Sequence, residues 1–258
     1  MTKPTLKLFY KENKAKSPLI IFIHGAACDH TIWCFQNRYF FNRGYSILTL
    51  DLPGHGENIS KPCNSIKEMR DLIKLLLDKF PQKEIILVGH SMGSLICLDI
   101  LDKKTTKVKK VFLIGVSVPM HVSETLIEKS KNNQEQAIGD MINWSLTNKV
   151  KLKGAKLIGT NLPNLVNVVM SNSKKGILHK DLLSCNNYSI NNNLKDFKGQ
   201  VNIILGEKDI MTPVRGVNSL KNIIPNLNIS LLKEVGHFHM LEDPIGVNKI
   251  IETNLQKK

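Results

Sequence analysis

A serine stands between two glycines in the segment G-H-S-M-G at residues 89–93. The segment follows an apolar run at 84–88 and opens a pattern with apolar residues at helical spacing, which predicts a strand, a sharp turn and a helix. In such a turn the serine takes a strained backbone conformation, and flanking glycines relieve the crowding around it. The exposed hydroxyl lies near the positive end of the helix, so Ser91 is a candidate nucleophile. An ordinary serine at a helix N-terminus is the alternative interpretation.

A serine hydroxyl is a weak nucleophile near neutral pH, so it needs a base that takes its proton and an acid that orients the base. Among the eight histidines, His237 follows an apolar strand pattern after a short loop, and His239 is its nearest rival. Asp209 lies in the turn after the strand pattern at 201–205, and Glu207 in the same turn is a weaker candidate acid. The chain order of serine, acid and histidine suits such a triad.

The elements that must position these residues alternate between strand-like runs and helix-period segments. This alternation predicts an α/β fold with a doubly wound, mainly parallel sheet. Two of the strand-like runs are almost wholly apolar inside, as expected for strands that are covered on both faces. The expected helices cover 66–80, 91–102 and 245–255, and the expected strands cover 6–10, 19–24, 45–50, 84–89, 108–114, 201–205 and 228–232.

The alternation of strand-like runs and helix-period segments stops between residues 119 and 198. This stretch is rich in Asn and Lys and has helical patches, such as Ile138, Met141, Ile142 and Ser145. We therefore expect a core domain at 1–118 and 199–258, with a helical cap inserted over the site at 119–198. A flexible or accessory surface insert is the alternative.

Length and composition suit a single globular domain with an insertion. The chain has 258 residues, 42% of them hydrophobic, and can bury a core that needs no metal or disulfide. The formal net charge is +14, but only four of the 36 cations are arginine. Base contacts and phosphate clamps depend on arginine, so we expect no nucleic-acid partner. The charge reflects either a bias in composition or a field that attracts anionic substrates or an acidic carrier.

The remaining features concern compartment and assembly. Five cysteines form no C-x-x-C pair, and an odd count suits free thiols in a reducing compartment. The lysine-rich N-terminus precedes no signal-peptide pattern, and the apolar run at 19–23 is far shorter than a membrane span. We expect a cytoplasmic protein without a membrane partner, and the sequence does not indicate an oligomeric state.

Five motifs resemble the α/β-hydrolase superfamily in order and spacing, over about residues 19–255: F-I-H-G-A-A (22–27), D-L-P-G-H-G (51–56), G-H-S-M-G-S (89–94), L-G-E-K-D (205–209) and V-G-H (235–237). The resemblance implies that Ser91, His237 and Asp209 are nucleophile, base and acid. It also implies an oxyanion hole formed by the N–H groups of Ala26 and Met92, with Ala27 as the neighbouring alternative to Ala26. No metal or organic cofactor is implied.

The expected reaction is hydrolysis of a small-molecule acyl substrate, most simply a carboxylic ester, through an acyl-enzyme. Dehalogenases and epoxide hydrolases of the superfamily need a carboxylate nucleophile, which a serine at position 91 excludes. Thioesterase, lactonase, C–C hydrolase, perhydrolase and eliminating synthase activities share the triad and stay open. So does a small-molecule receptor of the same fold.

Overall fold

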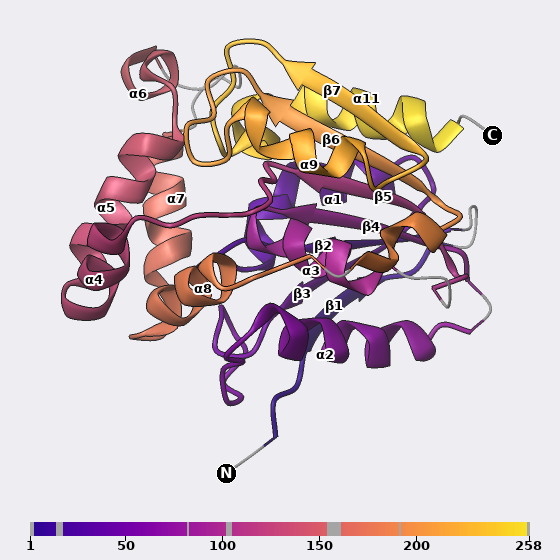
Figure 1. The fold of residues 1–258 in the computed structure, drawn as a ribbon, viewed down its shortest axis with the longest axis horizontal. Helices are drawn as coiled ribbons and strands as arrows, with labels where there is room; N and C mark the ends of the chain where they lie inside the picture. Colours follow the sequence, from indigo (N-terminus) through magenta and orange to yellow (C-terminus); the bar gives the residue numbers. More distant parts are fainter. Residues whose placement is uncertain are drawn as a thin grey trace.

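The computed structural model describes residues 3–13, 18–81, 83–101, 105–153, 161–190 and 192–256. Its centre is a seven-stranded sheet in the order β1-β3-β2-β4-β5-β6-β7 (Figure 1). β1 runs antiparallel to β3, and the other neighbours are parallel, which confirms the predicted mainly parallel α/β fold. The strands are β1 Lys7–Lys11, β2 Leu19–Ile23, β3 Ser46–Asp51, β4 Ile85–His90, β5 Val108–Ile114, β6 Gln200–Gly206 and β7 Leu227–Leu232.

The central strands are apolar on both faces because each face of the sheet has its own core. Along β2, Leu19, Ile21 and Ile23 belong to one apolar cluster, whereas Ile20 and Phe22 belong to the other. Successive side chains of a strand point to opposite faces, so a strand covered twice is apolar at every position. This double burial is why the sequence predicts the central strands to within about one residue.

Helices cover the two faces of the sheet. The apolar side chains of α2 (Ile66–Asp78), α3 (Met92–Ile100) and α9 (Asn218–Lys221) pack in one cluster, and those of α1 (Cys34–Phe41) and α11 (Pro244–Gln256) pack in the other. The helices expected at 66–80 and 245–255 are confirmed. The helix expected at 91–102 begins after Ser91, and its expected last residue, Asp102, lies outside the described residues. Among the described residues, no helix is long and apolar enough to cross a membrane.

Residues 119–198, which lie between β5 and β6 and which we call the insertion, contribute further helices at one end of the sheet, on the left in Figure 1. The predicted helical patch lies in its second helix and is buried. The division into core and cap domains remains a proposal. The helices are α4 Glu124–Asn132, α5 Gln134–Ser145, α6 Asn148–Lys153, α7 Leu162–Ser171 and α8 Ile177–Asn186; a short helix, α10 (His239–Glu242), follows β7.

The turn from β4 to α3 is packed so tightly, both within itself and against β2, that two of its positions have no room for a side chain. A Cβ atom on Gly89 would lie 2.4 Å from the carbonyl oxygen of Gly93. A Cβ atom on Gly93 would lie 2.3 Å from the carbonyl oxygen of Ile23. Backbone atoms cannot move aside as a flexible side chain can, so these glycines let α3 approach the sheet directly after Ser91.

We expect Gly93→Ala to lower the free energy of unfolding by about 1–3 kcal/mol, because the new methyl group meets main chain. Gly139→Ala is the matched control, since a Cβ atom there has no neighbour within 4 Å and the site is helical. It should raise stability by about 0.4–1 kcal/mol. Denaturant unfolding of both variants measures the difference, and equal effects would contradict the close packing.

Candidate active site

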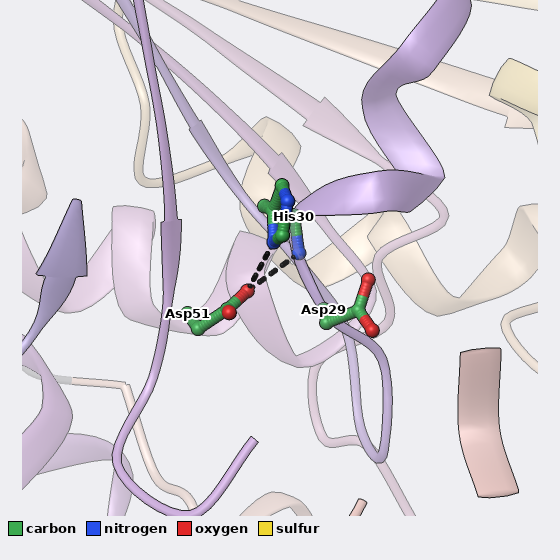
Figure 2. A group of neighbouring side chains, drawn as sticks. All are labelled: Asp29, His30 and Asp51. Atoms are coloured by element: carbon green, nitrogen blue, oxygen red, sulfur yellow. Dashed lines mark hydrogen bonds and ion pairs between the residues drawn. The ribbon is translucent and has the colours of Figure 1, made fainter. Parts of the chain in front are cut away.

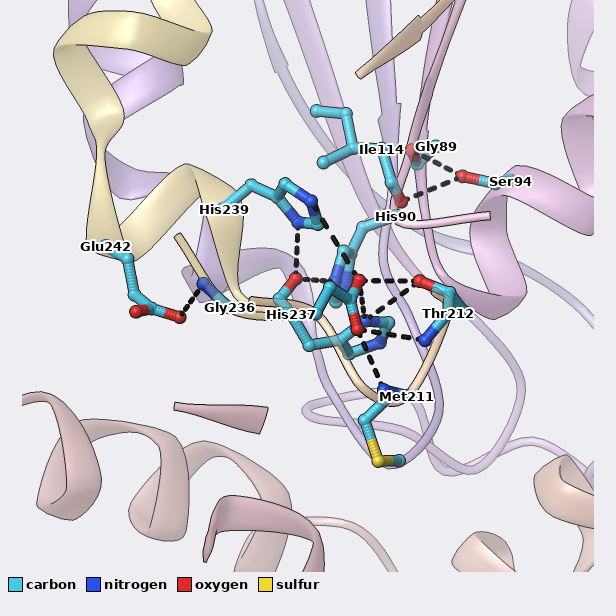
Figure 3. Close-up of polar contacts among 11 residues, drawn as sticks. Gly89, His90, Ser94, Ile114, Met211, Thr212, Gly236, His237, His239 and Glu242 are labelled. Carbon is cyan, nitrogen blue, oxygen red and sulfur yellow. Dashed lines mark hydrogen bonds and ion pairs between the residues drawn. The ribbon is translucent and has the colours of Figure 1, made fainter. Parts of the chain in front are cut away.

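Ser91 lies at a strained turn between β4 and α3. Its backbone has φ 52° and ψ −115°, a conformation that a residue with a side chain rarely adopts. The Ser91 N–H donates to the carbonyl oxygen of Ile114 on β5 at 2.9 Å. The hydroxyl oxygen of Ser94 lies 2.8 Å from the Gly89 carbonyl oxygen and 3.1 Å from that of Ile114 (Figure 3). These hydrogen bonds hold the strained turn in place.

His237 and Asp209 meet in a buried ion pair. Nδ1 of His237 lies 2.9 Å from Oδ2 of Asp209, and each residue is only 4% exposed. A carboxylate only accepts hydrogen bonds, so Nδ1 carries a hydrogen and the lone pair lies on Nε2 in the neutral ring. This contact is the one that Asp209 needs in order to orient His237 as the sequence predicts.

Asp209 stays ionised because it accepts several hydrogen bonds. Its Oδ1 accepts from the N–H groups of Met211 and Thr212, each at 2.9 Å, and its Oδ2 accepts from the Thr212 hydroxyl at 2.6 Å. Burial opposes the charge, yet the charge and hydrogen bond of His237 and the Thr212 hydroxyl hold the pKa of Asp209 well below its usual range. Glu207, the weaker candidate acid, accepts from the N–H of Glu234 in an exposed turn.

Two further histidines hold the carbonyl group of His237. Nε2 of His90 lies 3.0 Å from that oxygen, and Nδ1 of His239 lies 2.6 Å from it (Figure 3). Burial lowers the pKa of His239 to about 4 and that of His90 well below its usual value, so both donate as neutral rings. His239 is fully buried and its Nε2 lies 3.9 Å from Asp209, which is too far for a hydrogen bond. His239 thus bonds to the backbone of His237, and it lacks the hydrogen bond to Asp209 that would orient it as the base.

The turn after β2 presents the predicted Ala26 N–H. The Gly25 carbonyl oxygen accepts from the Cys28 N–H at 3.2 Å and from Nδ1 of His24 at 2.9 Å. The C=O and N–H of a trans peptide point in opposite directions, so these two bonds aim the Ala26 N–H the other way. Among the described residues, no acceptor takes this N–H. Ala27, the alternative donor, instead bonds to Asp181 at 2.9 Å.

Ser91 and His237 line the same cavity, which has a volume of about 170 Å³. Most of the other lining side chains are apolar, and several come from the insertion. None of the described lining residues is Lys, Arg, Asp or Glu. The full lining is Ala26, Ser91, Met120, His121, Val122, Ser123, Leu126, Met141, Trp144, Leu182, Cys185, Ile210, Met211, Thr212 and His237.

A second polar cluster, Asp29, His30 and Asp51, lies at the end of β3 (Figure 2). Oδ1 of Asp51 accepts from both the N–H and Nδ1 of His30, and its Oδ2 accepts from the Glu57 N–H. Asp29 accepts from the Thr31 N–H at 2.8 Å. Their potential ligand atoms lie within 4.8 Å of one another, but a metal ion would have to displace these hydrogen bonds. The cluster therefore stabilises its loops.

Sequence reasoning missed several residues around the site. Thr212 gave no signal beyond lying three residues after Asp209, although its hydroxyl bonds to that carboxylate. His121 and Trp144 line the cavity from the insertion, where no motif singles them out. Asp181 contacts the turn at Ala27 from 154 residues away in sequence. Such distant contacts have no local pattern that a sequence could reveal.

Acidification should remove the stability that Asp209 gains in the folded state. Its pKa is depressed from 3.8, so the unfolded chain takes up the proton first as pH falls. The stabilisation is complete above that unfolded value and is lost as pH falls through it toward the folded pKa. Between neutral pH and about pH 3, the melting temperature of Asp209→Asn should fall less than that of wild type.

Asp78→Asn is the control for this comparison, because its carboxylate is 78% exposed at the end of α2. It should follow the wild-type curve. If the melting temperatures of wild type and Asp209→Asn fell in parallel with pH, the ionised carboxylate of Asp209 would not stabilise the folded state.

Comparison with known proteins identifies the fold family. The family model described as alpha/beta hydrolase fold matches residues 18–244. The pimeloyl-acyl carrier protein methyl ester esterase of Wigglesworthia glossinidia brevipalpis is 25% identical over 255 residues, which cover 92% of this chain and 93% of that protein.

Two solved structures share the fold. An esterase from Exiguobacterium antarcticum superimposes with a TM-score of 0.85 at 15% identity and covers 98% of this chain and 96% of its own. A lipase-esterase related protein from Clostridium acetobutylicum gives 0.77 at 24% identity, over 96% and 99%. Relatives with esterase names support hydrolase activity. Since the family model spans most of the 258 residues, the chain belongs to the α/β-hydrolase fold family.

Proposed function

We propose that the protein is a serine hydrolase that cleaves carboxylic esters through an acyl-enzyme at Ser91. The observation that carries the proposal is the buried contact of 2.9 Å between His237 and Asp209 beside a cavity that Ser91 also lines. A histidine oriented by a carboxylate, next to a serine on a strained turn, is the arrangement that activates a hydroxyl for nucleophilic attack.

In the first half-reaction, Ser91 Oγ attacks the carbonyl carbon of the ester, and Nε2 of His237 takes its proton. Asp209 stabilises the imidazolium that forms. The carbonyl oxygen becomes an oxyanion, which accepts from the N–H groups of Ala26 and Met92. Met92 is the first residue of α3, so its N–H has no partner within the helix. Losing one such donor typically costs about 3 kcal/mol of transition-state stabilisation.

The first half-reaction ends when the first intermediate collapses: the ester C–O bond breaks, and His237 gives its proton to the departing alcohol oxygen. In the second half-reaction, water releases the acyl group. His237 then removes a proton from water, whose oxygen attacks the acyl carbon. The second intermediate collapses, and Ser91 Oγ regains the proton as the carboxylic acid leaves. Every proton in this sequence passes through Nε2 of His237, which is why its orientation matters.

The cavity supports a short, uncharged acyl group. A dry apolar cavity of about 150 Å³ in another protein holds a benzene molecule, and this one has about 170 Å³. By that measure it accommodates an acyl chain of about six carbons. An anionic acyl group would meet no lysine or arginine among the described lining residues. The lysines and arginines behind the net charge of +14 lie outside the described lining, so this charge makes no contact with an acyl group in the cavity.

The bond that we assign follows from the relatives. The Wigglesworthia protein is named a methyl ester esterase, which supports an ester and a small alcohol as the leaving group. The insertion supplies much of the cavity wall, so we propose that it acts as a cap that selects the acyl group.

A panel of p-nitrophenyl esters tests both the reaction and the substrate class. We expect kcat/KM to be highest from butyryl to hexanoyl and to fall at least about tenfold by decanoyl, because longer chains exceed the cavity. The kcat/KM for a neutral ester should exceed that for a succinyl ester of similar length. Ser91→Ala should reduce kcat by on the order of 10⁴-fold or more.

The matched control is Ser219→Ala, since the Ser219 hydroxyl donates to the Val118 carbonyl group outside the cavity. It should keep wild-type turnover. Retention of most activity by Ser91→Ala would remove this serine from the mechanism. Binding of esters without release of p-nitrophenol would favour a receptor, and preference for the succinyl ester would refute the uncharged substrate class.

A further inference from the structure

One carboxylate of the insertion contacts the turn that presents the Ala26 N–H. Oδ2 of Asp181, on α8, accepts from the Ala27 N–H at 2.9 Å and from Nε2 of His55 at 2.8 Å. Asp181 is 2% exposed and His55 is 1% exposed. The contact joins two buried loops of the core to a helix of the insertion.

Ala27 needs this contact because its backbone is strained. It has φ 52°, the left-handed region that disfavours residues with a Cβ atom. It is the third residue of the four-residue turn that the Cys28 N–H closes onto Gly25. In such a turn the peptide between the second and third residues can flip, and the bond to Asp181 holds its N–H on the side of α8. Ala26 is thus fixed through the peptide that follows it.

The opposite side of the same turn is held by His24. Its Nδ1 lies 2.9 Å from the Gly25 carbonyl oxygen, and its Nε2 accepts from the Leu52 N–H at 3.1 Å. One nitrogen donates and the other accepts, so the ring is neutral. Burial and the nearby His55 lower the pKa of His24 to about 3, in agreement with these bonds. Both peptides that flank Ala26 are therefore fixed, one by the core and one by the insertion.

His55 keeps Asp181 in place. Its Nδ1 lies 3.2 Å from the Pro53 carbonyl oxygen and its Nε2 faces the carboxylate, so both nitrogens face acceptors and the ring is an imidazolium. Burial disfavours this charge, but the charge and hydrogen bond of Asp181 raise the pKa of His55 above its usual value. The pair compensates two buried charges, and this fixes the carboxylate under Ala27.

Helix α8 is packed directly on the loop that carries His55. A Cβ atom on Gly54 would lie 2.5 Å from Cδ1 of Ile177 at the start of α8. Lys180 donates to the Asn64 side chain at 3.0 Å, and Lys174 donates to the Ile59 carbonyl oxygen at 3.0 Å. The packing of Ile177 against Gly54 holds the start of α8 on the core, whereas the two lysine bonds lie on the exposed surface and do not reach the turn.

We propose that Asp181 is a positioning residue for the oxyanion hole, through which the insertion holds the Ala26 N–H in line with the developing oxyanion. The inference rests on the proposed function, because it assigns a task to the Ala26 N–H. It adds that the insertion takes part in transition-state stabilisation as well as forming the cavity wall. Without the carboxylate, the Ala27 N–H and the His55 imidazolium lose their acceptor and the strained turn can relax.

The test compares Asp181→Ala and Asp181→Asn with wild type, at enzyme concentrations titrated with a fluorophosphonate. p-Nitrophenyl butyrate gives kcat and KM. A trifluoromethyl ketone, whose hemiketal with Ser91 bears an oxyanion, gives the affinity of the hole. We expect Asp181→Ala to lower kcat per titrated site by about 10- to 100-fold and to leave KM within about threefold. Ketone affinity should fall by a similar factor.

Asp181→Asn keeps an oxygen that can accept from the Ala27 N–H but loses the charge. Its kcat and ketone affinity should fall by roughly threefold or more, since charged acceptors bond more strongly than neutral ones. Lys180→Ala is the matched control: it removes a neighbouring contact between α8 and the core that does not reach the turn, so it should keep wild-type values.

A kcat per site and a ketone affinity that stay at wild-type values in Asp181→Ala would overturn the inference, even if its melting temperature falls. If that variant does not fold, wild-type values in Asp181→Asn overturn it. Failure of the proposed function is distinguishable: wild type would not turn over the ester, or Ser91→Ala would retain turnover, and the inference would fall with it. With an active wild type and an inactive Ser91→Ala, only the inference depends on position 181.

Discussion

The buried hydrogen bond between Asp209 and His237 is the interaction on which the rest of the site depends. A carboxylate removed from water is costly unless hydrogen bonds replace its hydration, and the turn after β6 supplies two N–H groups and the Thr212 hydroxyl. Once Asp209 is fixed, its charge sets the tautomer of His237 and leaves Nε2 free. The carbonyl group of His237 is held by His90 and His239, so neither the ring nor its backbone is free to turn.

The insertion is bound to the core at both halves of the site. The Ser145 carbonyl oxygen accepts from the His237 N–H at 2.6 Å, and Glu242 bonds to both Thr147 and the Gly236 N–H. On the other side of the cavity, Asp181 bonds to the turn at Ala27. The segment that forms the cavity wall thus also fixes the two loops that flank Ser91. In the proposed mechanism, the insertion therefore contributes both to substrate selection and to the geometry of the transition state.

The sequence predicts the parts of this structure that depend on local pattern. Central strands are apolar on both faces, and the glycines around Ser91 mark a turn where main chains touch, so both have local signatures. Helix α1 was not predicted, because it has only eight residues and its apolar side chains lie on several sides of the helix, so they form no single apolar face. The contacts of Thr212 and Asp181 depend on how distant segments pack, and the cavity wall depends on insertion side chains that match no motif.

In the proposed mechanism, the Asp209–His237 pair activates the hydroxyl of Ser91 and of no other serine. Peptide mass spectrometry after reaction with a fluorophosphonate measures this most directly, because the reagent phosphonylates an activated serine. We expect a single adduct, on the peptide that contains Ser91. An adduct on another residue, or an unmodified folded protein, would contradict it.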